Sequence, residues 1–267
     1  MSETFGGYYY KHQKDGKTVA LIPGFAGSRR FLQIITDDAS YEAPFTPGSC
    51  FTPQGIRVRV RQPELRVDGA VRYTGLTPLH SDIMGPFRFF PMECRHKVVS
   101  LYHRTHGAIT INGERFDLTG GIGYIEGDSG TSFPRAYGWA QSNDFPIPLS
   151  VMASAAEIPF AGIRFHGCIA AVWMAGREYR LATYRGARVL TCDERRLILR
   201  QGADLLRIDV EAGQGHPLAA PQNGKMSRTI HEHPSCPARF RFVHDGQLLF
   251  DLWSERASFE CVGRLAE

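Results

Sequence analysis

The sequence predicts an all-β protein, and three observations carry the prediction. Nearly every segment reads as a short run that either alternates between apolar and polar residues or is apolar throughout. No stretch of more than about ten residues keeps the helical period of 3.6. The 267 residues include 28 glycines and 16 prolines, which supply frequent turns. Short strands joined by frequent turns are typical of β-barrels and β-sandwiches.

The expected strands of the first half are short. Residues 17–23 and 31–36 form apolar runs, and residues 56–60 alternate strictly as Ile-Arg-Val-Arg-Val. Successive side chains of a strand point to opposite faces. The last segment therefore places its aliphatic side chains on one face and Arg57 and Arg59 on a solvated face.

Three dipeptides mark the expected hairpin turns: Asp68-Gly69, Asn112-Gly113 and Asp245-Gly246. Each lies between alternating runs, where such pairs favour two-residue turns. Residues 193–210 leave two interpretations open, because Leu197, Leu199 and Gly202 fit a strand as well as a helix.

Composition excludes several classes of protein. The net charge of +4 comes from 31 basic and 27 acidic residues without a block of like charges, so no nucleic-acid partner is indicated. The six cysteines are spaced singly, so we expect free thiols and no metal site. We also expect that the protein needs no cofactor. The N-terminus lacks an apolar signal core, and no segment approaches the ~18 apolar residues of a membrane span. We therefore expect a cytoplasmic protein.

The most informative run covers residues 121–145. It opens with a pattern typical of a strand, in which Tyr124, Glu126 and Asp128 alternate with smaller or apolar residues. Because alternate residues share a face, the two carboxylates would point the same way.

A second extended run follows Pro134. Tyr137, Trp139, Gln141 and Asn143 fall on one face, and alanine, glycine and serine fall on the other. The small face lets another layer of backbone approach closely. The large face suits the wall of a pocket for an apolar ligand, with a few polar groups to orient it. A packed barrel interior with hydrogen-bonded amides is the alternative.

This run resembles the signature of the tocopherol cyclase-like family, approximately GYIE-x-DWG-x-SFP-x-x-x-x-W-x-Q-x-N-x-F. The matching positions are residues 123–126, Asp128, Gly130, residues 132–134, Trp139, Gln141, Asn143 and Phe145. The chain departs at Ser129, where the family has Trp, and at Gly127, where Lys is common. Segments along the whole chain, such as residues 83–87 and 226–230, also resemble the family. The resemblance implies two packed lipocalin-like β-barrels. With a break at the glycine-rich residues 120–123, we expect domains of residues 1–122 and 123–267.

The resemblance also implies a reaction, in which a phenol adds across a prenyl alkene to form a chromanol-type ring. Protonation of the alkene needs a carboxylic acid that stays protonated in an apolar site, and Asp128 and Glu126 would share that proton. Trp139 and Tyr137 would face the resulting cation, and His96 would accept the phenol proton. The remaining expected substrate contacts are Tyr124, Gln141, Asn143 and Glu93.

Several of these residues have a structural alternative. Glu126 and Asp128 would also serve to cap a turn and to pair with Arg135. Alternation along residues 92–103 turns His96 inward, where it would be a hydrogen-bonded core histidine, and turns Glu93 outward unless a bulge intervenes.

One further cluster invites a metal reading. His231 and His233 share a strand face and would chelate a metal together, or they lie in an exposed turn before Pro234.

The sequence therefore predicts an isomerase of tocopherol cyclase type, an intramolecular lyase that acts on a prenylated phenol or another isoprenoid. Peripheral contact with membranes is expected, because such substrates reside in bilayers. Two alternatives remain open: a lipocalin-like protein that binds an isoprenoid or lipid without turnover, and a hydratase that adds water to an isoprenoid alkene. No nucleophile elbow or glycine-rich phosphate loop supports a hydrolase or a nucleotide-binding protein.

Overall fold

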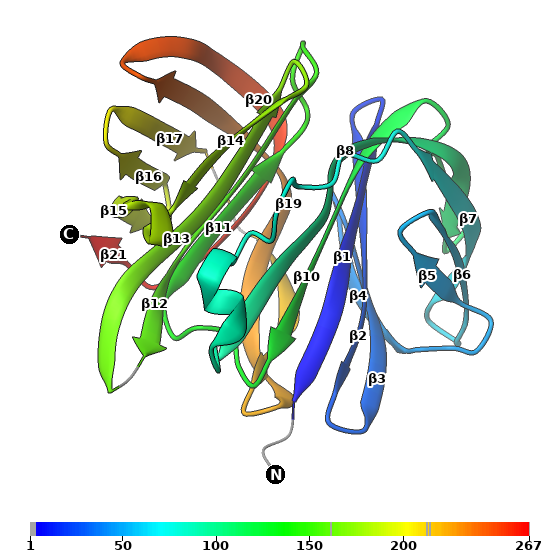
Figure 1. Cartoon of the computed structure of the whole chain (residues 1–267). Coiled ribbons are helices and arrows are strands. Elements are labelled where there is room, and N and C mark those ends of the chain that lie inside the picture. The colour runs from blue at the N-terminus through cyan, green and yellow to red at the C-terminus, as the bar shows by residue number, and fades with distance from the viewer. Residues whose placement is uncertain (1–3, 161, 212, 214, 267) are drawn as a thin grey trace.

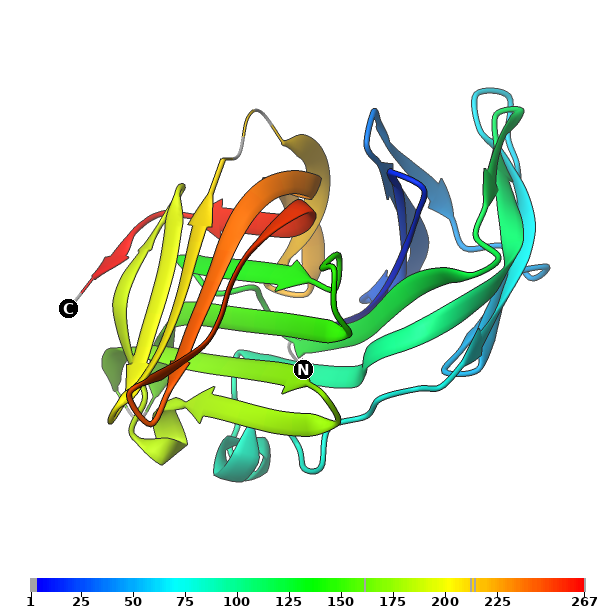
Figure 2. The same ribbon diagram turned by 90° about the horizontal axis from the view of Figure 1, so that it is seen from above.

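Two curled antiparallel sheets lie side by side in the computed structural model, which describes residues 4–160, 162–211, 213 and 215–266 (Figure 1). Figure 2 shows the same two sheets from above. The predicted all-β fold with two packed lipocalin-like units is confirmed. Among the described residues, no helix has the length and apolar character to cross a membrane.

Ten strands form the first sheet, with β1 and β10 near its centre, in the order β4-β3-β2-β1-β10-β8-β7-β6-β5 and with β9 paired to β8. Their bounds are β1 Phe5–Lys14, β2 Lys17–Ala26, β3 Arg29–Thr36, β4 Ser40–Pro44, β5 Cys50–Thr52, β6 Gly55–Arg61, β7 Arg66–Thr74, β8 Cys94–Ile111, β9 Glu114–Asp117 and β10 Gly121–Gly130. A short 3-10 helix, η1 (Gly85–Phe89), precedes β8.

Eleven strands form the second sheet, in the order β14-β13-β12-β11-β20-β19-β17-β16-β15-β21 and with β18 paired to β19. Their bounds are β11 Tyr137–Ser142, β12 Leu149–Phe160, β13 Ile163–Met174, β14 Arg177–Ala182, β15 Arg188–Asp193, β16 Arg196–Gln201, β17 Asp204–Val210, β18 His216–Gln222, β19 Lys225–His244, β20 Gln247–Val262 and β21 Leu265–Ala266. A second 3-10 helix, η2 (Thr183–Arg185), follows β14.

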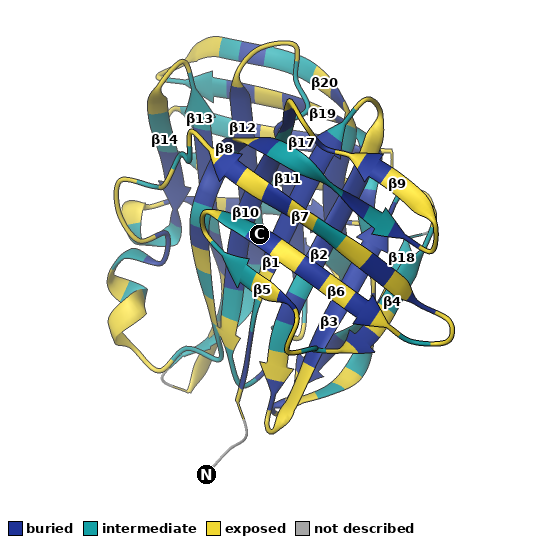
Figure 3. Cartoon of the chain, turned by 90° about the vertical axis from the view of Figure 1, so that its right-hand side faces the viewer, coloured by how far each residue is buried: buried dark blue, intermediate teal, exposed yellow. Residues whose placement is uncertain are grey.

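Local pattern explains most of these strands. The side chains of β6 alternate between buried and exposed as predicted, and Figure 3 shows the alternation along β6 and β7. Asn112-Gly113 and Asp245-Gly246 form the predicted turns, and all four residues have the positive φ that such turns require. Residues 193–210, left open between helix and strand, lie mostly in β16 and β17.

The predicted turn at Asp68-Gly69 is wrong, because both residues lie inside β7. A Cβ on Gly69 would come within 2.4 Å of the backbone oxygen of Ala108 on β8. Glycine is therefore needed here for the close approach of two strands rather than for a change of direction.

The chain passes from the first sheet to the second between Gly130 and Tyr137. A division at 122/123 would instead assign β10, which is paired to β1 and β8 inside the first sheet, to the second unit. The glycine-rich break at residues 120–123 is a turn that leads into β10. The change of sheet comes only after the whole of β10.

The core has three main parts. One cluster of buried side chains fills each sheet's own concave side, and a third lies at the seam between them. The seam contains Tyr9 and Tyr124 from the first sheet and Trp139 and Ile230 from the second. Aromatic residues of both units therefore meet where the two sheets pack.

Candidate functional site

A cavity of about 210 Å³ lies at this seam and is lined by residues of both sheets. Its surface is mainly apolar, and it includes the rings of Phe31, Phe87, Phe133 and Trp139. The carboxyl groups of six acidic residues also border it: Glu93, Glu126, Asp128, Glu157, Glu232 and Glu260. An apolar cavity with so many ionisable groups is unusual for a core and typical of a functional site.

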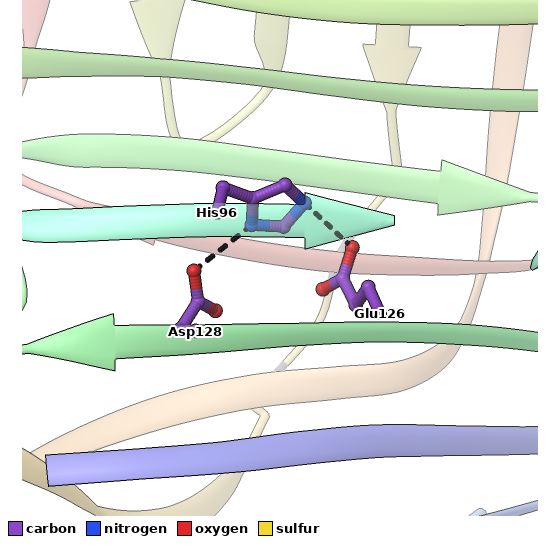
Figure 4. Close-up of side chains that lie close together, drawn as sticks. All are labelled: His96, Glu126 and Asp128. Carbon is purple, nitrogen blue, oxygen red and sulfur yellow. Dashed lines mark hydrogen bonds and ion pairs between the residues drawn. The ribbon is translucent and has the colours of Figure 1, made fainter. Parts of the chain in front are cut away.

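The first polar feature of the cavity is a cluster of His96, Glu126 and Asp128, which Figure 4 shows. Nδ1 of His96 lies 2.9 Å from Oδ1 of Asp128, and Nε2 lies 3.1 Å from Oε2 of Glu126. The β8–β10 register puts His96 directly opposite Asp128. Glu126 and Asp128 share a face of β10, so both carboxyl groups reach the same imidazole ring. The predicted common face of Tyr124, Glu126 and Asp128 is confirmed, because Tyr124 also donates to Glu126.

The charges of this cluster compensate one another. Burial by itself lowers the pKa of His96, but the charges of Glu126 and Asp128 outweigh burial and raise the pKa well above its usual 6.5. The ring between these two side chains therefore favours its protonated form. In the described residues the ion-pair partner of the two carboxylates is His96 and not Arg135.

The two carboxylates differ in their surroundings. Oε2 of Glu126 also accepts hydrogen bonds from the hydroxyl of Tyr124 and, at 3.2 Å, from Nε1 of Trp139. Its side chain is only 6% exposed, whereas that of Asp128 is 26% exposed. Sγ of Cys94 lies 3.7 Å from Oδ1 of Asp128. Glu126 is thus fixed by several donors, while Asp128 faces the cavity more openly.

The same three residues bring their ligand atoms within 4.8 Å of one another, a spacing that could hold a metal ion. The orientation of the imidazole argues against that use. The two carboxylates lie at opposite ring nitrogens, and only one of these nitrogens can face a given ion. The arrangement suits an imidazole ring with a hydrogen bond to Asp128 at Nδ1 and a charge contact with Glu126 at Nε2 better than a cage for a metal ion.

A second polar feature lies on the wall formed by the second sheet and consists of Glu232 on β19 and Glu260 on β20. The hydroxyl of Tyr9 donates to Oε1 of Glu232 at 2.5 Å, and the hydroxyl of Tyr137 donates to Oε1 of Glu260. Burial raises the pKa of Glu232 to about 7. Burial, reinforced by the charges of Asp128 and Glu126, raises the pKa of Glu260 well above its usual value.

Sequence reasoning did not single out these two glutamates. Glu232 was passed over between His231 and His233, which were weighed as metal ligands or as an exposed turn. In the structure this segment lies inside β19, so the exposed turn is wrong. Alternation along the strand would have indicated that Glu232 points inward, because it shares a strand face with the buried Ile230 and Cys236.

The other predicted site residues divide into two groups. Three of them line the cavity: Tyr137, Trp139 and Glu93. Alternation along the strand predicted an outward Glu93, but this residue precedes the first residue of β8, so the alternation of that strand does not determine its direction. Burial raises the pKa of the Glu93 carboxyl. Tyr124 lies behind Glu126 and is fully buried.

Gln141 and Asn143 lie outside the cavity lining and join the two sheets instead. Gln141 accepts a hydrogen bond of 2.9 Å from Nζ of Lys11, and it donates one of 2.8 Å to Asn143. Asn143 donates to the backbone oxygen of Gly123 at 2.9 Å. These amides are hydrogen-bonded inside the protein, as the alternative interpretation of the sequence held.

The position at which the chain departs from the family signature, Ser129 in place of Trp, lies at the surface. Ser129 is exposed and does not line the cavity. The opposite face of β11 is small for a different reason from the predicted one, because a Cβ on Gly138 would come within 2.3 Å of the side-chain sulfur of Cys192 and not of a second layer of backbone.

Comparison with known proteins supports the fold. No protein-family model and no curated protein sequence matches the chain. Among solved structures, kievitone hydratase from Nectria haematococca is similar with a TM-score of 0.56 and 10% identity, over 98% of this chain and 89% of that one. A Nitrosomonas europaea protein provisionally described as AttH is similar with a TM-score of 0.51 and 12% identity, over 96% of this chain and 91% of that one. At such identities the likeness concerns the fold.

Proposed function

We propose that the protein catalyses addition of a hydroxyl group across an isoprenoid alkene, and that the hydroxyl is a phenol of the same molecule. The product would be a chromanol-type ring and an isomer of the substrate. The observation that carries the proposal is the cavity at the seam, because it combines an apolar, aromatic lining with opposed acidic and basic groups. This combination is what protonation of an unactivated alkene needs.

The aromatic groups suit a cationic intermediate. Protonation of a trisubstituted alkene breaks the π bond, forms a C–H bond and leaves a tertiary cation. The ring of Trp139 packs edge to face against Tyr9 at 5.4 Å, and both rings border the cavity together with Tyr137. Their electron-rich faces would stabilise the cation while the apolar lining keeps water away.

The cluster of His96, Glu126 and Asp128 would accept the proton of the phenol as the C–O bond forms. The sequence favours this pair of carboxyls as the acid, with His96 as the base. In the structure the ring of His96 lies between the two carboxyl groups, and the pKa of this ring is raised, so His96 is less suited to accept a proton. We therefore assign the base to Asp128, which is the more exposed of the two, with His96 holding its charge and orientation.

Hydration of an isoprenoid alkene is the second candidate. It shares the protonation step and differs only in the nucleophile, which is water. The similarity to kievitone hydratase along almost the whole chain favours it, although that similarity concerns the fold. A cavity that admits a water molecule beside Asp128 would serve this reaction with the same residues.

The test is incubation with a panel of prenylated hydroquinones in heavy water, followed by chromatography and mass spectrometry. An isomeric product with one solvent deuteron on carbon supports cyclisation, and a product heavier by one water supports hydration. Asp128→Asn should abolish turnover and remain folded, while Asp117→Asn, at an exposed carboxylate on β9, should retain it. Tight binding of the panel without any product would refute catalysis and leave a binding protein.

A further inference from the structure

We propose that Glu232 and Glu260 form a carboxyl pair that stores and delivers the proton required by the alkene, an inference that rests on the proposed function. The pair faces the cavity from the second sheet, across from the cluster of His96, Glu126 and Asp128 on the first. The glutamates of the second sheet would then supply the general acid, and Asp128 of the first sheet would supply the general base.

The geometry of the sheet brings the two carboxyls together. Glu232 of β19 and Glu260 of β20 are direct cross-strand partners, and Trp139 of β11 is the next partner of Glu260 in the same row. Directly opposed side chains on neighbouring strands have Cβ atoms about 5 Å apart. Both glutamates line the cavity and are nearly buried, with 4% and 7% of their surface exposed. The two glutamate side chains thus start from neighbouring backbone positions and line the same cavity.

The charges around the pair favour a retained proton. Within the described residues, neither glutamate forms an ion pair with a lysine or arginine. The titratable groups that act on them are Tyr9, Lys11 and Glu126 for Glu232, and Tyr137, Asp128, Glu126 and Cys261 for Glu260. Lys11 is the one cation in this set, and burial lowers its own pKa to about 7. Burial is the main cause that raises the pKa of each glutamate, and with so little compensating charge both carboxyls favour the protonated form.

The hydrogen bonds leave each carboxyl able to act. One oxygen of Glu232 accepts from Tyr9 and one oxygen of Glu260 accepts from Tyr137. In the described part of the chain, no hydrogen bond reaches the second oxygen of either group. A proton on that oxygen would be free to leave toward the cavity.

The proton count balances over a turnover. The O–H bond of the protonated glutamate breaks as the new C–H bond forms, which leaves a carboxylate on this wall and a cation on the substrate. The phenol O–H bond breaks as the C–O bond forms, and its proton goes to Asp128. Asp128 then releases a proton to solvent and the glutamate pair takes one up. Because that proton exchanges with solvent, heavy water labels the product at carbon.

The first experiment compares the double variant Glu232→Gln/Glu260→Gln with the wild type, using 2-prenylhydroquinone in heavy water. Glutamine has the shape of a protonated glutamate, so binding, followed by quenching of tryptophan fluorescence, should change less than about threefold. Deuterium entry at carbon should fall by about 10²–10⁴-fold, the usual contribution of a general acid. Glu114→Gln, at an exposed carboxylate on β9, serves as the control and should label normally.

Two outcomes overturn the inference, and they distinguish its failure from failure of the proposed function. If the double variant labels the probe at the wild-type rate, the pair is not the acid, although the proposed reaction stands. If the wild type labels no probe, both fail. An infrared difference spectrum, wild type minus double variant at pH 7, adds a test without substrate. It should contain a carboxylic acid C=O band, and its absence would show that the pair holds no proton.

Discussion

Replacement of His96 by glutamine should destabilise the protein in a way that depends on pH. The ring bridges Asp128 and Glu126 at 2.9 and 3.1 Å and is 10% exposed. Removing one partner from a buried charge cluster typically costs roughly 3–5 kcal/mol, and the partial exposure of Asp128 suggests the lower end, about 3 kcal/mol. Urea unfolding at pH 6, followed by tryptophan fluorescence, measures this loss.

The sign of the pH dependence follows from the direction of the pKa shift. The folded-state pKa of His96 lies above the value near 6.5 of the unfolded chain. The stabilisation is therefore complete below pH 6.5 and is lost as the pH rises through the folded-state pKa. The gap between wild type and His96→Gln should narrow at alkaline pH. His106→Gln, on the same strand, should change stability by less than about 0.5 kcal/mol.

A double-mutant cycle with Asp128→Asn sharpens the test. Contacting charged residues usually show coupling of about 0.5–3 kcal/mol, and the short contact between Nδ1 and Oδ1 predicts a value in the upper half of that range. Equal losses at acid and alkaline pH, together with zero coupling, would refute the charge-bridge account of this cluster.

Three further predictions concern the seam and the second sheet. Tyr9→Phe removes the hydrogen bond to a buried carboxyl and should cost about 1–3 kcal/mol in urea unfolding. Lys11 has a folded-state pKa of about 7 against an ordinary 10.5, so wild-type stability should gain from this group as pH rises from 7 to 10.5. Lys11→Met should lack that gain when unfolding is compared at pH 7 and pH 9.5. Gly138→Ala forces a Cβ to within 2.3 Å of Sγ of Cys192 and should cost about 1–3 kcal/mol, whereas Gly213→Ala, with open space around it, should be tolerated in thermal unfolding.

The parts of the site that sequence alone could predict are those fixed by local alternation. Tyr124, Glu126 and Asp128 share a face because they are neighbours on one strand, and the inward direction of His96 follows in the same way. Glu232 and Glu260 depend instead on the pairing of β19 with β20. That register is set by packing along the whole of both strands, which no local pattern specifies.

The amides of Gln141 and Asn143 show a second limit. The sequence predicted that both amides share a face with Tyr137 and Trp139, but it did not predict their hydrogen-bond partners. Lys11 and the backbone of Gly123 belong to the first sheet, and they meet these amides only because the two units pack together. A polar stripe in a sequence therefore does not reveal whether it faces a ligand or another part of the same chain.

Two side-chain hydrogen bonds at the seam join the first sheet to the second. Trp139 of the second sheet donates to Glu126 of the first, and Tyr9 of the first donates to Glu232 of the second. A shear of one unit against the other by a few ångströms would break both links while every strand kept its own hydrogen bonds. Heating or pressure could thus silence the site while circular dichroism remained unchanged. The geometry of the candidate site therefore depends on how the two sheets pack against each other, as a site between two subunits depends on their interface.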